Sequence, residues 1–235
     1  DGEVRRAAEE LGRETELDRI LPYREIVRLR ESLMEGELFW SYVYRHAGEA
    51  YGPASAWIIQ EGLLEPVRYA VADSGWTGSM QLTLNRLLDS MSYRGKLEGF
   101  YYGLYHIPEK ADPRDYHVYY FGPEGRIKRK VYFSNCLFES VFSQPEGMCI
   151  GYERTEEGVA PLREEVRPGN GAILDCVTRE VEEQAGAEKE SLPERLLDWH
   201  IQEPGDAQRR LARLMARPTR KEAEVFGGMA FSDDV

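Results

Sequence analysis

The segment YAVADSGWTGSMQLTLNRLL, residues 69–88, decides the predicted fold of this chain. Apolar residues over 67–73 predict a strand that ends in one carboxylate. The small polar residues of 74–79 then predict a tight loop, and leucines at helical spacing predict an amphipathic helix that begins near Met80. An aromatic, β-prone segment follows at 96–107. Strand, loop, helix and strand in this order form the unit of a parallel α/β sheet with a right-handed crossover.

The flanking segments predict helices on both sides of this unit. We expect an α/β fold, Rossmann-like with a mostly parallel sheet, a helical N-terminal layer and a small helical C-terminal tail. The corresponding segments are a helical layer at 1–62, an α/β ligand-binding core at 63–180, and a charged linker with a helical tail at 181–235. We expect all three to form one compact domain of a longer protein.

Smaller elements are predicted between and within these segments. Residues 116–121 and 126–133 flank the turn sequence GPEG and predict a β-hairpin. Residues 135–143 predict a helix and 148–154 a strand. In the tail, Thr219 with a glutamate three residues later predicts a helix that begins with a capping box. The apolar residues expected on the tail helices are Leu196, Leu197, Trp199, Leu211, Leu214 and Met215.

The charge of the chain argues against nucleic acid as a partner. Thirty basic and 42 acidic residues give a formal net charge of −12, whereas a nucleic-acid binder needs a positive surface that displaces counterions. The basic run at 126–130 alternates with apolar residues, which favours a solvated strand or hairpin edge.

The cysteines and the hydropathy pattern indicate the compartment. Cys136, Cys149 and Cys176 are odd in number and lack the paired spacing of a zinc site, so we expect neither a disulfide framework nor a structural metal. A reducing, cytoplasmic location fits this pattern. No segment approaches about 18 uninterrupted apolar residues, so we expect no integral membrane segment.

The predicted loop has the composition of an anion site. In open α/β sheets, ligands bind beyond the carboxyl ends of the strands, where glycine-rich turns and helix N-termini attract phosphate. Gly75 and Gly78 would allow close backbone approach, and Trp76 offers a flat face for a sugar ring or base. Asp73 at the strand end could accept a sugar hydroxyl or hold a metal. The competing interpretation, a helix-capping turn with the tryptophan packed on the core, has about equal weight.

Two residues farther along the chain extend the candidate site. Glu139, on the helix predicted at 135–143, could accept hydroxyls, although a solvated helix residue is the simpler interpretation. His106 lies just beyond the second strand, at the expected ligand edge. The cofactor is not identified, although Mg²⁺ would suit a phosphate-bearing ligand. The candidate catalytic residues are Asp73 and Glu139, and the candidate ligand-binding residues are Ser74, Gly75, Trp76, Thr77, Gly78, Ser79, Gln81 and His106.

Several motifs in order resemble one bacterial family. VADSGWTGSMQ is similar to the V-D-I-G-W-x-G-[ST]-[MI]-Q signature of predicted haloacid dehalogenase-superfamily hydrolases encoded in capsule and O-antigen gene clusters. EGFYYGLY resembles the family's G-[YF]-Y-x-G-L strand, LFESVFSQPEGMCIGY its E-x-L-F-x-A-P-x-G segment, and RPTRKEAEVFGGMAFSDD its N-P-[ST]-x-x-E-A tail. Together these motifs span residues 67–234. Ser74 departs from the signature, which has isoleucine at that position.

The resemblance implies the second, non-phosphatase module of these proteins. A phosphatase of this superfamily has an aspartate nucleophile in a D-x-D-x-[TV] loop, whereas ILDCVTRE has Asp175 followed by Val177 at the second acidic position. The phosphatase domain of the family lies upstream of the signature. An upstream phosphatase domain or a glycosyltransferase is therefore the protein partner that the resemblance implies.

Three functions are compatible with these features. The first is a module that binds a nucleotide sugar or phosphosugar, acting as a glycosyl- or sugar-phosphate transferase in bacterial surface-polysaccharide biosynthesis. The second is a non-catalytic scaffold or specificity module attached to a phosphatase or glycosyltransferase. The third is a phosphoribosyltransferase-like enzyme, because Asp73 precedes Thr77-Gly78 at a compatible spacing, although Ala72 stands at the first acidic position.

Overall fold

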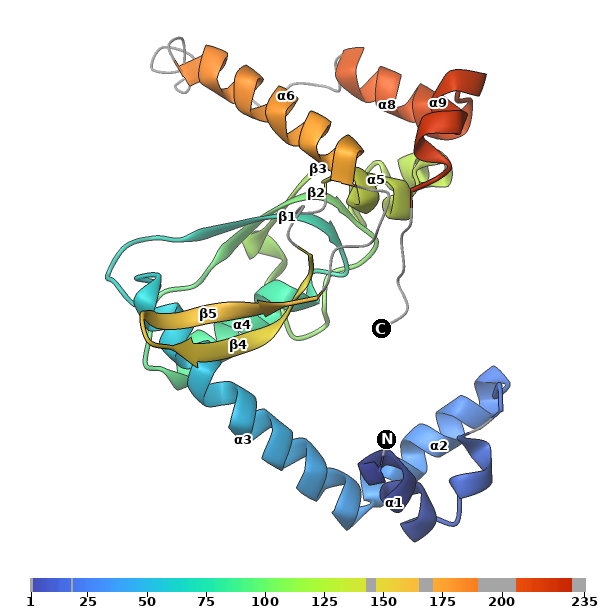
Figure 1. The fold of residues 1–235 in the computed structure, drawn as a ribbon, viewed down its shortest axis with the longest axis vertical. Coiled ribbons are helices and arrows are strands. Elements are labelled where there is room, and N and C mark those ends of the chain that lie inside the picture. Colours follow the sequence, from blue (N-terminus) through green and yellow to red (C-terminus); the bar gives the residue numbers. More distant parts are fainter. Residues whose placement is uncertain (1, 18, 143–146, 165–170, 190–205, 230–235) are drawn as a thin grey trace. The chain divides into compact units, whose positions relative to one another are not determined.

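The chain divides into two compact units, which are described separately. The computed structural model describes residues 2–17, 19–142, 147–164, 171–189 and 206–229 (Figure 1). One unit, here the N-terminal unit, contains Asp1–Glu61 and Gly151–Ala160. The other, here the sheet unit, contains Gly62–Ile150 and Pro161–Val235. Among the described residues, no helix combines the length and the apolar composition needed to cross a membrane.

The N-terminal unit is helical, as the sequence predicts. Glu3 on the first helix contacts Arg45 and His46 on the last, and the His46 Nε2 to Glu3 Oε2 distance is 2.6 Å. Hydrogen bonds from His46 and Arg45 lower the pKa of Glu3 to about 2. The elements are α1 (Gly2–Glu10), the short 3-10 helix η1 (Glu14–Glu16), α2 (Tyr23–Glu35) and α3 (Glu37–Gln60).

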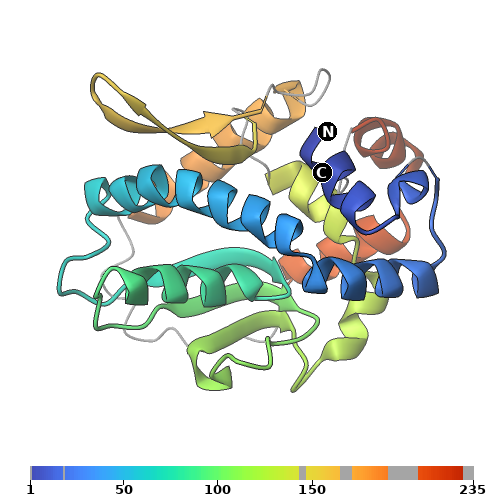
Figure 2. The ribbon, with the colours of Figure 1, turned by 90° about the horizontal axis from the view of Figure 1, so that it is seen from below.

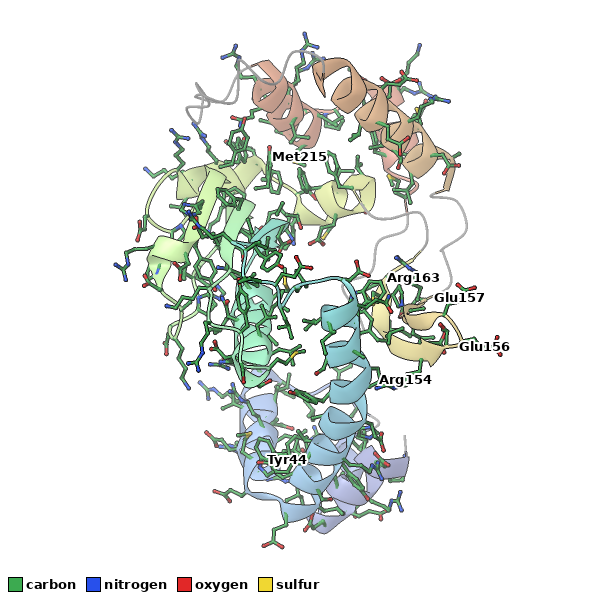
Figure 3. All side chains as sticks on the ribbon, turned by 90° about the vertical axis from the view of Figure 1, so that its left-hand side faces the viewer. Tyr44, Arg154, Glu156, Glu157, Arg163 and Met215 are labelled. Atoms are coloured by element: carbon green, nitrogen blue, oxygen red, sulfur yellow. The ribbon has the colours of Figure 1, made fainter. Side chains whose placement is uncertain are left out.

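The rest of this unit, Gly151–Ala160, is the larger part of a two-stranded sheet, which confirms the strand predicted at 148–154. The sheet consists of β4 (Cys149–Thr155) and β5 (Gly158–Arg163). Glu156 and Glu157 form the connecting turn and are labelled in Figure 3. Gln60, at the end of α3, donates to the carbonyl of Val159 at 3.0 Å and accepts from its amide at 2.9 Å.

The sheet unit contains a small parallel sheet. Its strands are β1 (Ala70–Trp76), β2 (Glu98–Leu104) and β3 (Tyr116–Phe121), in the order β1-β2-β3. Both pairs are parallel, which confirms the α/β class and the parallel pairing predicted from the strand–helix–strand pattern. Three strands make a smaller sheet than the predicted Rossmann-like core.

Helix α4 (Ser79–Ser90) connects β1 to β2 and packs on one face of this sheet (Figure 2). Its side chains Gln81 and Leu88 are buried, at 0% and 1% exposure. On the sheet, Tyr101 and Leu104 are buried together with Tyr116 of β3. Removal of these apolar surfaces from water holds the helix on the strands.

The predicted hairpin at 116–121 and 126–133 is wrong in its second half. The turn does form, because Gly122 and Gly125 exchange backbone hydrogen bonds of 2.9 and 3.2 Å. The next residues, however, form the 3-10 helix η3 (Ile127–Tyr132). Arg129 of η3 donates to the carbonyl of Tyr120 at 3.1 Å and lies over its ring, so side-chain contacts connect η3 to β3 in place of a strand ladder.

Helices form the remainder of the sheet unit. The main-chain amide of Ser134 donates to the Sδ of Met215 at 3.3 Å, which links α8 (Asp206–Ala216) to the segment before α5 (Asn135–Phe142) (Figure 3). The predicted capping box of Thr219 and Glu222 is confirmed, with both reciprocal bonds present. Leu196, Leu197 and Trp199 lie outside the described residues. The helices are α5 (Asn135–Phe142), α6 (Gly171–Lys189), α8 (Asp206–Ala216) and α9 (Arg220–Phe226).

Candidate functional site

The candidate site lies at the carboxyl ends of the three parallel strands. Trp76 at the end of β1 pairs with Leu104 at the end of β2, and Gly103 pairs with Phe121 at the end of β3. The amide of Tyr105 extends the ladder by donating to the carbonyl of Trp76 at 2.7 Å. These ends therefore share one edge of the sheet, which is where open α/β sheets bind their ligands.

The predicted loop is shorter than the sequence indicates, because Ser74, Gly75 and Trp76 belong to β1. Gly75 has a φ of +119°, and a Cβ at this position would lie 1.9 Å from the carbonyl oxygen of Gly103. Glycine is required here by the close approach of two strands. Gly75 therefore has a structural role at the strand end, and the loop itself is Thr77-Gly78.

Gly78 provides the turn from β1 into α4. Its φ is +63°, a left-handed conformation that favours glycine, and a Cβ would lie 2.7 Å from Cε1 of Tyr116. The Tyr116 hydroxyl also donates to the carbonyl of Gly78 at 3.2 Å. The backbone conformation at position 78 therefore favours glycine, and the contact with Tyr116 leaves no room for a larger side chain.

The N-terminus of α4 carries two exposed hydroxyl groups. Gly78 is the N-cap residue, and within the part of the chain that the structure describes no side chain accepts a capping hydrogen bond from this helix. Neither Thr77 nor Ser79 is the N-cap residue of α4. Instead, Thr77 Oγ1 and Ser79 Oγ lie 3.0 Å apart, and both residues are exposed. Donor hydroxyls and helix amides at a positive helix end form a favourable environment for an anion.

Asp73 lies inside β1, three residues before its end. Its Oδ1 accepts a hydrogen bond from the amide of Gly75 at 3.1 Å and lies 3.4 Å from the hydroxyl of Ser74. The carboxylate therefore stabilises the irregular backbone at the end of the strand. Asp73 pairs across the sheet with Tyr101, whose pKa is raised mainly by burial, with a smaller effect of the Asp73 charge.

The structure brings together Trp76 and Glu139, which are 63 positions apart in the chain. The indole Nε1 of Trp76 donates to Oε1 of Glu139, on α5. The indole lies among aromatic rings, with centroid distances of 5.9 Å to Tyr105, 5.3 Å to Phe133 and 6.0 Å to Phe138. Both predicted site residues therefore participate in an internal contact, and the ring faces of Trp76 pack mainly against protein.

Gln81 does not face the candidate ligand edge. Its amide group is fully buried, donates to the carbonyls of Leu97 at 2.8 Å and Asp115 at 3.1 Å, and accepts from Tyr101 at 2.7 Å. Gln81 therefore connects α4 to the sheet, and its amide group is occupied by protein partners. His106 is exposed two residues after β2 ends, at the same edge as Trp76.

Sequence reasoning missed the basic segment beside this edge. Lys130 of η3 places its Nζ 5.6 Å from the ring centroid of Tyr105, which follows β2. Burial raises the pKa of Tyr105, with smaller effects from Cys136 and Glu139. The basic run at 126–130 was the available signal, but its alternating pattern indicated a strand edge. Within the described ranges, no group of three His, Cys, Asp or Glu residues is placed to hold a metal ion.

No protein-family model matches the sequence, and no curated protein matches it. The class of protein is therefore given by the fold of the described residues. The sheet unit is an α/β unit with a small parallel sheet, and a tight glycine turn and a helix N-terminus stand at its carboxyl edge.

Proposed function

We propose that the sheet unit binds the phosphate group of a nucleotide sugar or phosphosugar at the N-terminus of α4. We further propose that the chain acts as a glycosyl- or sugar-phosphate transferase module in bacterial surface-polysaccharide biosynthesis. The observation that carries the first proposal is the pair of exposed hydroxyls, Thr77 and Ser79, at a helix end without a side-chain cap among the described residues. The resemblance of 67–234 to the polysaccharide-cluster family supports the second.

The charge of a leaving phosphate fits this position. In a transfer reaction the phosphate-bearing group departs with the electron pair of the broken bond, so negative charge accumulates on its oxygens. Helix amides and hydroxyl donors at a positive helix end stabilise such charge. Asp73 and Glu139 already bind Gly75 and Trp76, so we assign them to positioning of the strand end.

A thermal-shift titration of the full chain tests the binding proposal. The panel contains nucleoside diphosphates, nucleotide sugars, sugar phosphates, phosphoribosyl diphosphate and inorganic phosphate, each with and without Mg²⁺. A ligand at a hundred times its dissociation constant stabilises the folded state by about 2.7 kcal/mol. We expect a hit that Thr77→Val combined with Ser79→Ala weakens.

Thr83→Val is the matched control for this experiment. Thr83 lies on the same helix, and its hydroxyl donates to the carbonyl of Ser79 at 3.0 Å. Its loss should leave ligand binding intact. Gly78→Val is unsuitable, because a Cβ at this position would clash with Tyr116 and disturb the fold. A hit that survives the double substitution would contradict the site, and a preference for phosphoribosyl diphosphate would favour the phosphoribosyltransferase-like alternative.

A non-catalytic scaffold or specificity module is the second candidate. The observation that favours it is the packing of Trp76 among aromatic rings, with its indole bonded to Glu139. A strand end filled in this way by protein side chains suits a module that positions a phosphatase or glycosyltransferase partner. A well-folded chain that is stabilised by no member of the panel would support this function over the first.

A further inference from the structure

A pocket of about 440 Å³ lies along β3 and the turn that follows it. Its lining includes Ile107, Tyr116, Tyr119, Gly125 and Arg126. All the lining residues belong to the sheet unit and to its described part. The volume falls within the range of about 300–1,000 Å³ that small-molecule pockets occupy.

This pocket shares a wall with the N-terminus of α4. Tyr116 lines the pocket, and its hydroxyl donates to the carbonyl of Gly78, the residue that precedes α4. Gly78 also lies against Pro108, the neighbour of the lining residue Ile107. The pocket and the turn before α4 are therefore neighbours through Tyr116 and the segment 107–108.

The lining has the chemistry of a site for a flat, polar ring. Tyr119 is 40% exposed and presents an aromatic surface on which a base can stack. Glu124 adds an acceptor for the edge of a base, and Arg126 adds a positive charge to the lining. The η3 segment that follows carries Lys128 and Lys130, which add positive charge to the chain next to the pocket.

We infer that this pocket binds the nucleoside part of a nucleotide whose phosphates lie at the N-terminus of α4. The inference rests on the proposed function and makes it more specific, because it selects a nucleotide sugar over a phosphosugar. The nucleoside supplies the stacking contact, and the phosphates supply the charge.

Calorimetric titration of the full chain with UDP, ADP, GDP and CDP tests the inference, with glucose 1-phosphate and inorganic pyrophosphate as ligands that lack a base. Loss of one stacked ring weakens binding between about 5-fold and 150-fold. We expect Tyr119→Ala to weaken binding of at least one nucleoside diphosphate within that range, and Tyr119→Phe to retain it. Neither change should alter the affinity for pyrophosphate.

Gly125→Phe provides a second, independent variant. A Cβ at Gly125 meets nothing within 4 Å, so the new ring can occupy the pocket rim without a clash. We expect nucleoside diphosphate binding to fall at least tenfold. Gly228→Phe is the matched control, because Gly228 has the same open surroundings and does not line the pocket.

The outcomes separate this inference from the proposed function. Nucleotide binding that is unchanged in both Tyr119→Ala and Gly125→Phe overturns the pocket assignment, even if Thr77→Val with Ser79→Ala abolishes it. Affinity for glucose 1-phosphate equal to that for the nucleotides also overturns the pocket and leaves the phosphate site standing. No binding of any probe to a folded sample overturns both.

Discussion

Replacing Gln81 by leucine tests whether this residue holds the fold or binds a ligand. The change removes an amide that donates to the carbonyls of Leu97 and Asp115 and accepts from the hydroxyl of Tyr101. The contacts with Leu97 and Tyr101 are buried, and the contact with Asp115 is partly buried. A buried polar group that loses its partner costs about 1–3 kcal/mol. The substitution leaves three such groups without their partner. Because the surrounding structure can relax and the effects are not fully additive, we expect a loss of roughly 3–6 kcal/mol in the free energy of unfolding.

Urea unfolding of the ligand-free chain measures this loss from the shift of the midpoint. Because small proteins are stable by about 5–15 kcal/mol, the expected loss is a large fraction of the total. Tyr101→Phe removes one of the three orphaned groups, so the double variant should be more stable than additivity of the single changes predicts. A loss below about 1 kcal/mol would refute a structural role for Gln81 and favour its role as a ligand-binding residue. Strict additivity would refute only the contribution of its bond to Tyr101.

Two further predictions follow from contacts of other residues. Gly75→Ala should lower the free energy of unfolding by more than about 2 kcal/mol, because the backbone at Gly75 has a positive φ and the new Cβ clashes with the facing strand. If the melting temperature of the variant equals that of the parent chain, the strand end adapts to the new side chain. Glu3 has its pKa lowered to about 2 by hydrogen bonds from His46 and Arg45, so its stabilising contribution is present above the ordinary value of 4.5 and is lost as the pH falls toward 2. In the Glu3→Gln variant, the melting temperature should therefore decrease less between pH 4.5 and pH 2 than it does in the parent chain. An equal decrease in both proteins would show that this contact does not contribute to stability.

The local pattern of the sequence predicted the parallel unit well. Leucines at helical spacing gave α4, and an aromatic β-prone run gave β2, because both signals depend on residues close in the chain. Parallel pairing followed from the need for a crossover between the two strands. The capping box of Thr219 is equally local and was also predicted.

The errors occur where a distant residue determines the conformation. The local sequence around Gly75 is typical of a loop. The carbonyl that leaves no room for a Cβ belongs to Gly103 on the neighbouring strand, and the local sequence does not show that these two glycines face each other. The segment 126–133 alternates like a strand, yet Arg129 bonds to the carbonyl of Tyr120 and the chain coils. The partner of Trp76 likewise lies far away, on α5, so its internal contact had no signal in the local pattern.

The structural roles of the glycines and of Trp76 bear directly on the proposed site. A binding site must be held in place by residues whose own positions are fixed by packing. Gly75 fixes the strand end against β2, Gly78 is fixed against Tyr116, and the indole of Trp76 is anchored to α5. These supports leave Thr77 and Ser79 as the exposed residues of the turn, with their hydroxyls 3.0 Å apart on a constrained backbone. The packing around Trp76 favours the scaffold function, whereas the two exposed hydroxyls support the ligand-binding function. The response of ligand binding to the loss of these two hydroxyls therefore separates the two functions.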